Sequence, residues 1–182
     1  MVHGITIRQE RLRDIEAREI LLDDAFGEAR FTKSSQRLRD GRLPADGLSF
    51  VACEGARVVG TVRLWSVSCG GRDALLLGPM AVADDCRSRG IGAKLIGRAL
   101  REARRRGHGA VVLVGDAAYY GRFGFSNART HGLRMPGKPE PERLLAIQFV
   151  PGALDGAHGA IIATGTTVPE ITVPSRPLRH AA

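Results

Sequence analysis

The sequence predicts an α/β protein of the α+β kind, built on a mixed central sheet with helices on its faces. Apolar, strand-like runs follow one another over residues 48–82 with glycine-containing turns between them, which favours antiparallel neighbours. From residue 91 to 103 the apolar residues recur with a helical period, and a short apolar strand follows at 111–114. Strand, loop, helix and strand in this order predict a βαβ unit.

The N-terminal forty residues predict a strand followed by a long helix. The run Ile5–Arg8 is suited to an opening strand. Leu12, Ile15 and Ile20 are among the residues that then keep a 3.6-residue period, which predicts a helix over about residues 10–26. A second, shorter and more polar helical patch is expected at 32–39.

A run of antiparallel strands is expected next. The expected strands are 48–54, 57–67 and 75–82. A tight turn containing Gly55 joins the first two, and the glycine-rich stretch 68–72 turns the chain into the third. Gly78-Pro79 interrupts the third strand, because proline is excluded from regular interior ladders.

A basic, glycine-bearing loop leads from this strand into the amphipathic helix. It reads Arg87-Ser88-Arg89-Gly90-Ile91-Gly92. The first turn of a helix has unpaired N–H groups and a partial positive charge, so it binds anions and phosphates above all. The two glycines lack the Cβ atoms that would hold a phosphate away from the backbone, and the two arginines add positive charge. The loop predicts a pyrophosphate-binding site.

The remainder of the chain predicts short strands and a tail. After a loop rich in glycine, proline and basic residues at 126–141, strands are expected at 144–150 and 160–163. Three prolines and few apolar residues follow residue 164, which argues for an extended segment without a core of its own. We therefore expect one domain over residues 1–163 and an extended C-terminal tail over 164–182.

Two motifs resemble the GNAT N-acetyltransferase superfamily. The pattern R-x-x-G-x-G at residues 87–92, between a strand and an amphipathic helix, is similar to the coenzyme A loop of that family, Gln/Arg-x-x-Gly-x-Gly/Ala. The pattern Y-x-x-x-G-F at residues 120–125 resembles a second segment of the family. Together they look closest to the YhbS-like predicted N-acetyltransferases. The resemblance spans about residues 5–162 and is sharpest over 77–125.

The resemblance implies a fold and a cosubstrate. It implies a GNAT-like mixed, mostly antiparallel sheet with helices on both faces and two strands that splay around the cofactor. Acetyl-CoA is the implied cosubstrate, without a metal, and the pantetheine arm would pair with the strand before the loop. A backbone N–H near Met80 would then polarise the thioester oxygen. The expected cofactor-binding residues are Met80, Ala81, Val82, Arg87, Ser88, Arg89, Gly90, Ile91, Gly92 and Ala93.

Tyr120 is the expected catalytic residue. In the proposed reaction an amine attacks the thioester directly and the coenzyme A thiolate leaves. A phenol with a pKa of about 10 stays protonated at neutral pH and can donate to that thiolate. Tyr120 matches the tyrosine of the family motif, four residues before Gly124, whereas Tyr119 does not match and is expected to be a packed aromatic.

The general base is left unassigned. Many family members have a glutamate on the strands before the cofactor loop, but residues 57–82 offer only Asp73, at a turn. Asp116 is better explained as the N-cap of a helical turn, and His131 as a solvated loop residue. Cys86 lacks a neighbouring histidine and is interpreted as a small turn or core residue rather than an acyl-carrying nucleophile.

Composition excludes several other classes. Three cysteines without paired spacing argue against a disulfide framework or a zinc site, and no apolar run is long enough to span a membrane. No leader segment opens the sequence, so a cytoplasmic protein is expected. The net charge of +8 is concentrated in part at residues 98–106, on the solvent side of the amphipathic helix and without interleaved aromatics, so a nucleic-acid partner is not expected.

Two alternatives to a small-amine N-acetyltransferase stay open. The first is a non-catalytic acyl-CoA-binding or regulatory module, suggested by the missing base. The second is an RNA-associated acetyltransferase acting on charged tRNA or a ribosomal protein, suggested by the arginines at 98–106. The acceptor is expected to be a small-molecule or peptide amine, with Phe26, Arg30 and Phe31 as candidates for its binding. The resemblance is also compatible with a homodimer through the later strands.

Overall fold

The computed structural model of the chain describes residues 4–137 and 140–168. The strands are β1 (Ile5–Gln9), β2 (Ser49–Glu54), β3 (Arg57–Cys69), β4 (Arg72–Val82), β5 (Ala110–Val114), β6 (Leu133–Arg134), β7 (Leu144–Gln148) and β8 (Gly159–Ala163). The α-helices are α1 (Ile15–Phe26), α2 (Ile91–Arg105) and α3 (Ala117–Gly121). One-turn 3-10 helices lie at Leu12–Asp14, Glu28–Phe31, Gln36–Leu38, Asp84–Cys86 and Pro141–Arg143.

The strands of the described residues form one mixed sheet. Its main path has the order β1-β2-β3-β4-β5-β7. Neighbours along this path are antiparallel except for β4 and β5, which are parallel. β8 pairs with the far end of β3, and β6 runs parallel to β8. The mixed, mostly antiparallel sheet expected from the sequence is confirmed.

β4 and β5 separate after a short parallel contact. Leu75 and Leu76 of β4 pair with β5. Beyond them β4 continues along β3, whereas β5 continues along β7. The register of β3 against β4 shifts between Val62 and Leu64, and the Gly78-Pro79 bond of β4 lies opposite that shift, at the point of separation. The sheet therefore contains the splayed pair of strands that the family resemblance implies.

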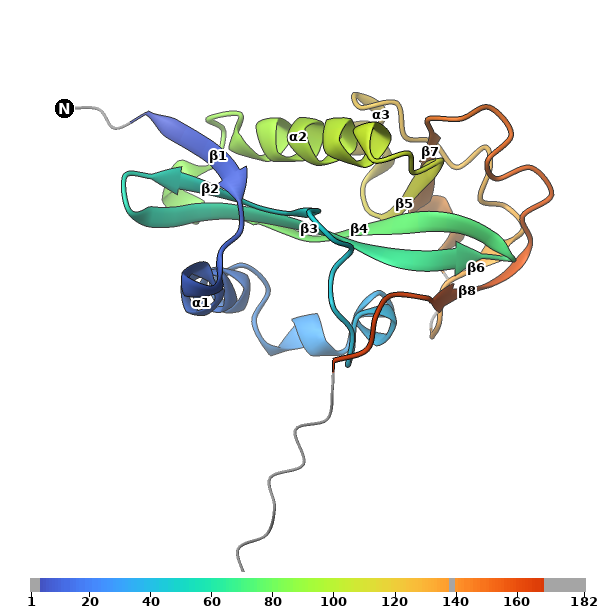
Figure 1. Ribbon diagram of the computed structural model, residues 1–182, viewed down its shortest axis with the longest axis horizontal. Helices are drawn as coiled ribbons and strands as arrows, with labels where there is room; N and C mark the ends of the chain where they lie inside the picture. The colour runs from blue at the N-terminus through green and yellow to red at the C-terminus, as the bar shows by residue number, and fades with distance from the viewer. Residues whose placement is uncertain (1–3, 138–139, 169–182) are drawn as a thin grey trace, which may run out of the picture.

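Helices cover both faces of the sheet. Figure 1 shows α2 on one face, with α1 and the one-turn helices that follow it on the other. α2 packs on β2 and β3, and α1 packs on β3 and β4. The apolar stripe predicted for α2 is buried, whereas its basic residues Lys94, Arg98, Arg101, Arg104 and Arg105 are exposed. The buried residues of α2 are Ile91, Leu95, Ile96, Ala99 and Ala103.

α1 begins at Ile15 rather than near residue 10. Asp14 forms a turn before the helix, because one of its carboxylate oxygens accepts the Arg11 N–H at 2.7 Å. Arg8 of β1 donates two further hydrogen bonds to the same carboxylate, at 2.6 and 2.8 Å. These contacts fix residues 10–14 as a corner between the first strand and the first helix.

The apolar period indicated the buried face of α1 only in part, since Leu21 is buried but other residues of the period are not. Leu12 and Ile20 are 87% and 55% exposed, whereas Arg18 is 4% exposed. Arg18 is buried because it forms an ion pair with Glu10, which also pairs with Arg63 of β3. The inward face of the helix is therefore partly ionic, which hydrophobic spacing alone cannot indicate.

Two other expectations were only roughly right. The helical patch expected at 32–39 is reduced to the single 3-10 turn at Gln36–Leu38. Part of the expected tail is tied to the fold, since the N–H of Leu43 donates to Thr166 and the N–H of Val168 donates to Gly41. The remainder of that tail, residues 169–182, lies outside the described residues.

Candidate functional site

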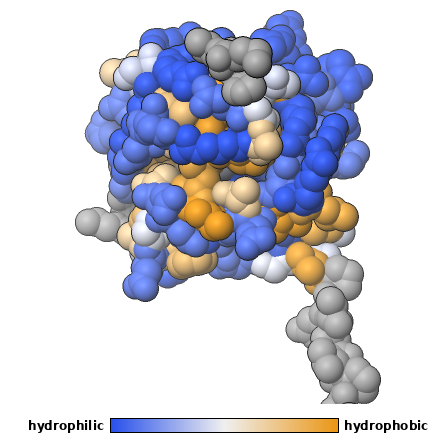
Figure 2. Space-filling model, turned by 90° about the vertical axis from the view of Figure 1, so that its left-hand side faces the viewer, coloured by the Kyte–Doolittle hydropathy of each residue, from blue (hydrophilic) through white to orange (hydrophobic). Residues whose placement is uncertain are grey.

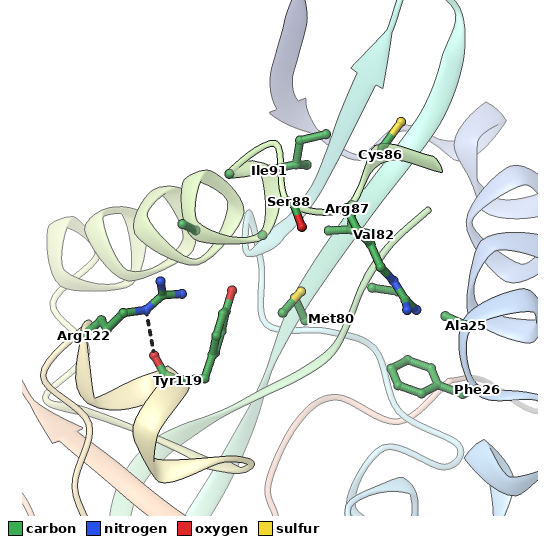
Figure 3. Close-up of a pocket in the computed structure, with 14 residues that line it drawn as sticks. Ala25, Phe26, Met80, Val82, Cys86, Arg87, Ser88, Ile91, Tyr119 and Arg122 are labelled. Carbon is green, nitrogen blue, oxygen red and sulfur yellow. Dashed lines mark hydrogen bonds between the residues drawn. The ribbon is translucent and has the colours of Figure 1, made fainter. Parts of the chain in front are cut away.

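A cleft of about 590 Å³ opens where β4 ends and α2 begins. Figure 2 shows hydrophobic side chains at the centre of the face at which β4 ends, surrounded by hydrophilic ones. Figure 3 shows that the cleft is bounded by β4, the loop before α2, α1 and α3. Its lining residues are Ala25, Phe26, Met80, Ala81, Val82, Cys86, Arg87, Ser88, Gly90, Ile91, Gly92, Ala93, Tyr119 and Arg122.

The first turn of α2 supplies free backbone N–H groups to this cleft. The N–H of Lys94 is the first to bond within the helix, to the carbonyl of Gly90, so the amides at positions 91–93 have no intrahelical acceptor. Gly90 precedes the helix with a φ of 74°, which favours glycine. At Gly92 a Cβ would meet the Tyr119 hydroxyl at 3.0 Å. The site is thus able to bind an anion against bare backbone.

The two arginines of the loop take different directions. Arg87 lines the cleft, and in Figure 3 its side chain points into the space between β4 and α1. It is well exposed and forms an ion pair with Asp84 at 2.7 Å. Arg89 instead donates to Glu54 at 2.7 Å. Of the ten cofactor-binding residues expected from the sequence, Arg89 alone is absent from the cleft lining.

The end of β4 forms one wall of the cleft. Met80, Ala81 and Val82 all line it, in the part of β4 that pairs with β3 on one side and has left β5 on the other. The backbone groups facing the gap are therefore free to pair with an extended ligand as an added strand would.

The two tyrosines of α3 serve different cavities. Tyr119 lines the cleft, and its ring meets the Tyr120 ring edge to face with centroids 5.0 Å apart. Tyr120 lines a second cavity. Burial raises the pKa of Tyr120 to about 12, so its hydroxyl is protonated at neutral pH. A Cβ on Gly115 would lie 2.3 Å from the Tyr120 ring, so this glycine leaves room for the ring.

Asp116 holds α3 in place, as its sequence position indicated. Its side chain accepts the Tyr119 N–H at 2.6 Å, which is the geometry of an N-cap. The other groups weighed as bases or nucleophiles lie elsewhere. Asp73 is exposed at the start of β4, His131 is exposed on its loop, and Cys86 is buried.

The second cavity, of about 270 Å³, meets the cleft. Phe26 and Met80 line both. Among the sequence-predicted acceptor residues, Phe26 and Arg30 line this second cavity, whereas Phe31 is 58% exposed. The other lining residues are Lys33, Ser35, Arg39, Leu77, Gly78, Pro79, Val114, Gly115, Asp116, Tyr120 and Arg143.

Sequence reasoning missed two kinds of site residue. The Arg122 guanidinium lies 4.5 Å from the centroid of the Tyr119 ring and lines the cleft. Arg122 follows Tyr119 by three residues on a helical turn, and that spacing could have indicated the contact. Lys33, Arg39 and Arg143 come from segments with no motif, so no local signal marks them.

The described residues show neither a membrane span nor a metal cluster. Within 4–137 and 140–168 no helix has the length and apolar character needed to cross a bilayer. In the same residues no three histidine, cysteine or acidic side chains gather as metal ligands would.

Known proteins share this sequence and this fold. Residues 15–125 match the Acetyltransferase (GNAT) family. The uncharacterized N-acetyltransferase YhbS of Escherichia coli K12 is 31% identical over 157 residues, 85% of this chain and 93% of the relative. The structure of E. coli YhbS in complex with CoA has a TM-score of 0.76 at 29% identity, covering 90% and 91% of the two chains. A Brucella melitensis GNAT family acetyltransferase in complex with acetyl-CoA has a TM-score of 0.68 at 28% identity, covering 89% and 97%.

Proposed function

Since the chain belongs to the GNAT acetyltransferase family, we propose that it moves an acetyl group from acetyl-CoA to a primary amine by direct attack. One observation carries the proposal: two cavities meet at Phe26 and Met80, one beneath a helix N-terminus and the other beside Tyr120. Such a pair of cavities suits a reaction in which a thioester from one side meets an amine from the other. Acetyl-CoA as cosubstrate is supported by the two relatives whose structures contain CoA or acetyl-CoA.

In this proposal the cleft holds the cofactor. The amides at the start of α2 and the side chain of Arg87 bind the pyrophosphate, with Ser88 beside them. The pantetheine arm pairs with the free edge of β4 at Met80–Val82. Arg89 acts from outside the cleft, through its ion pair with Glu54, by holding the loop against the β2–β3 turn. Arg122 offers a second cation to the phosphates.

The acetyl transfer then takes place beside the backbone of Met80. The amine lone pair attacks the thioester carbon, and a backbone N–H near Met80 stabilises the oxyanion that forms. The C–S bond breaks, and the thiolate takes a proton from the Tyr120 hydroxyl. The amine loses its extra proton to water, which also restores the Tyr120 proton. Tyr120 is supported as the acid by its place in the second cavity. Its pKa of about 12 keeps it protonated at neutral pH, although burial also makes the phenol a weaker donor.

A dedicated base is not part of the proposal. Asp116 is the one carboxylate that lines the second cavity among the described residues, and it caps α3. We therefore expect the acceptor to react as the neutral amine that is present in solution. Neither a regulatory module nor an RNA-directed enzyme is favoured by these observations. We also propose that residues 1–163 form one acetyltransferase domain and 164–182 a C-terminal extension.

Calorimetry and a thiol-release assay test this function. We expect acetyl-CoA to bind the purified protein, and free thiol to appear when primary amines are added with acetyl-CoA. Gly92→Val is the informative variant, since its side chain would project against the Tyr119 hydroxyl and obstruct the cradle. It should weaken acetyl-CoA binding. If the wild-type protein shows no heat with acetyl-CoA at high micromolar concentration, the proposed function is wrong.

A further inference from the structure

The second cavity carries more positive than negative charge. Its cationic lining residues are Arg30, Lys33, Arg39 and Arg143. The carboxylate of Asp116 is the single anionic group that lines it among the described residues. That carboxylate already accepts the Tyr119 N–H at 2.6 Å. The cavity next to the proposed thioester position therefore has a positive potential.

Two of the four cations are compensated within the protein. Arg30 pairs with Glu19 at 2.7 Å and with Asp23 at 2.8 Å. Arg143 pairs with Glu140 at 2.9 Å. The uncompensated charge of the cavity therefore comes from the other two cations.

Arg39 is the unusual member of the group. It is 7% exposed, and its Nε is buried without a hydrogen-bond partner among the described residues. Its nearest polar contact is a long one, from Nη2 to the Ser35 Oγ at 3.4 Å. Among the residues that the structure describes, no carboxylate forms an ion pair with Arg39. Burial lowers the pKa of Arg39 to about 10, so it remains a cation at neutral pH. A buried guanidinium without an anion is costly, and a ligand that brings one would relieve that cost.

The position of Arg39 orients such a ligand toward the thioester. Its Nη1 lies 3.7 Å from the place where a Cβ on Gly78 would sit, and Gly78 is two residues before Met80. In the same cavity the Lys33 ammonium lies 4.0 Å from the centroid of the Phe26 ring, which lines both cavities. An anion held between these two cations leaves the other end of a small molecule facing Met80.

On the basis of the proposed function, we infer that the acceptor is a small amine that also carries an anionic oxygen group, and that Arg39 and Lys33 bind this group. A guanidinium pairs with a carboxylate or a phosphate through two parallel hydrogen bonds, which fixes orientation as well as charge. The cavity of about 270 Å³ suits a zwitterion of a few carbon atoms. The amine of that molecule is then the nucleophile.

Matched acceptors test the inference directly. Glycine against glycinamide, and β-alanine against its amide, differ in one negative charge and hardly in size. Taurine and O-phosphoethanolamine extend the series to a sulfonate and a phosphate, so the series identifies which anion is used. We expect kcat/KM, expressed per concentration of neutral amine, to be about 10- to 100-fold higher for the anionic member of the matching pair, the range for hydrogen bonds to a charged group.

Variants connect that preference to the two cations. Arg39→Met should abolish the preference by raising KM for the anionic acceptor while leaving acetyl-CoA affinity unchanged, and Arg39→Lys should retain part of it. Lys33→Met, at an exposed position, tests the same point without disturbing the core. Arg72→Met, at the exposed far end of β4, is the control and should behave as wild type.

Binding supplies a second readout that needs no turnover. Titration of the protein with the anionic acceptors should give heat that Arg39→Met removes, while the amides give none. The inference is overturned if no anionic probe binds, if amides are used as well as their acids, or if Arg39→Met lowers the rate with both equally. A wild-type protein that does not bind acetyl-CoA would instead overturn the proposed function.

Discussion

Tyr119 and Tyr120 are adjacent in the chain, yet a single turn of helix directs them into different cavities. Tyr119 borders the cleft beside Gly92, and Tyr120 borders the second cavity, in which we place the acceptor. Met80 lines both cavities, so each tyrosine shares a cavity with it. Chemistry alone therefore cannot separate them, since each offers a phenol to a leaving thiolate.

Replacement of Tyr120 by phenylalanine separates their roles. If Tyr120 is the general acid, Tyr120→Phe should lower kcat by roughly 100-fold or more, the usual contribution of such a group, and should leave acetyl-CoA affinity unchanged. Steady-state thiol release and calorimetry measure the two quantities. Tyr119→Phe is the matched control and should change kcat far less. The opposite pattern would assign the acid to Tyr119, and an unchanged kcat in both would remove the acid step from the mechanism.

Motif residues were predictable at this scale and charge partners were not. The spacing of Gly90 and Gly92 before an apolar helical repeat predicts a phosphate cradle where the structure has a cleft, because a local backbone requirement leaves a local signal. The pairing of Arg89 with Glu54, 35 residues away, left no such signal. Arg39 gave no local signal, since it lies on the segment between α1 and β2 and is brought together with β4 only by the fold.

At the scale of elements, α2 and α1 show when hydrophobic spacing is informative. α2 has every inward position apolar, so its start, its end and its buried face follow from the sequence. α1 buries Arg18 and exposes Ile20, because Glu10 supplies an inward partner for the arginine. A single buried ion pair can therefore shift the buried face away from part of the apolar period.

The corner before α1 should make the free energy of unfolding depend on pH in the acidic range. Hydrogen bonds from the Arg8 guanidinium lower the pKa of Asp14 from 3.8 to about 2. Because the folded-state pKa is the lower one, the pair stabilises the protein above about pH 4, and that stabilisation is lost as the pH falls from 4 toward 2. A shift of this size corresponds to about 2 kcal/mol of unfolding free energy.

Urea unfolding at several pH values measures this contribution. Wild type and Asp14→Asn should differ in unfolding free energy by up to about 2 kcal/mol at pH 6, and the difference should shrink below pH 4. Arg8→Gln should show the same trend, because it removes the other half of the pair. A difference that stays constant from pH 6 to pH 3 would mean that the ion pair is not its source.

At the scale of the whole molecule, the sheet divides between β4 and β5, next to the cleft. β1 to β4 form one antiparallel block and β5 with β7 another, joined by a parallel contact at Leu75 and Leu76. The antiparallel run from β2 to β4 was predictable because its two hairpins are local. The separation of β4 from β5 was expected from the family resemblance. Periodicity did not indicate it, because both strands remain apolar beyond their parallel contact. Gly78-Pro79 was the one local sign of it.

The divergence predicts where acetyl-CoA will protect the backbone. If the pantetheine arm pairs with the free edge of β4, amide exchange over residues 80–82 should slow when acetyl-CoA is added, because new hydrogen bonds form there. The amides at 91–93 should slow as well, since they would bind the pyrophosphate. Hydrogen exchange followed by mass spectrometry at short labelling times measures both segments.

The hairpin turn at Gly70 and Gly71 provides the internal control for that experiment. It joins the same two strands, β3 and β4, at the end away from the cleft, so acetyl-CoA should leave its exchange rate unchanged. Equal slowing at the turn and at 80–82 would indicate general stabilisation rather than an added strand. Protection at 91–93 without protection at 80–82 would leave the phosphate cradle in place and remove β4 from cofactor binding, and with it the route by which the thioester reaches Met80.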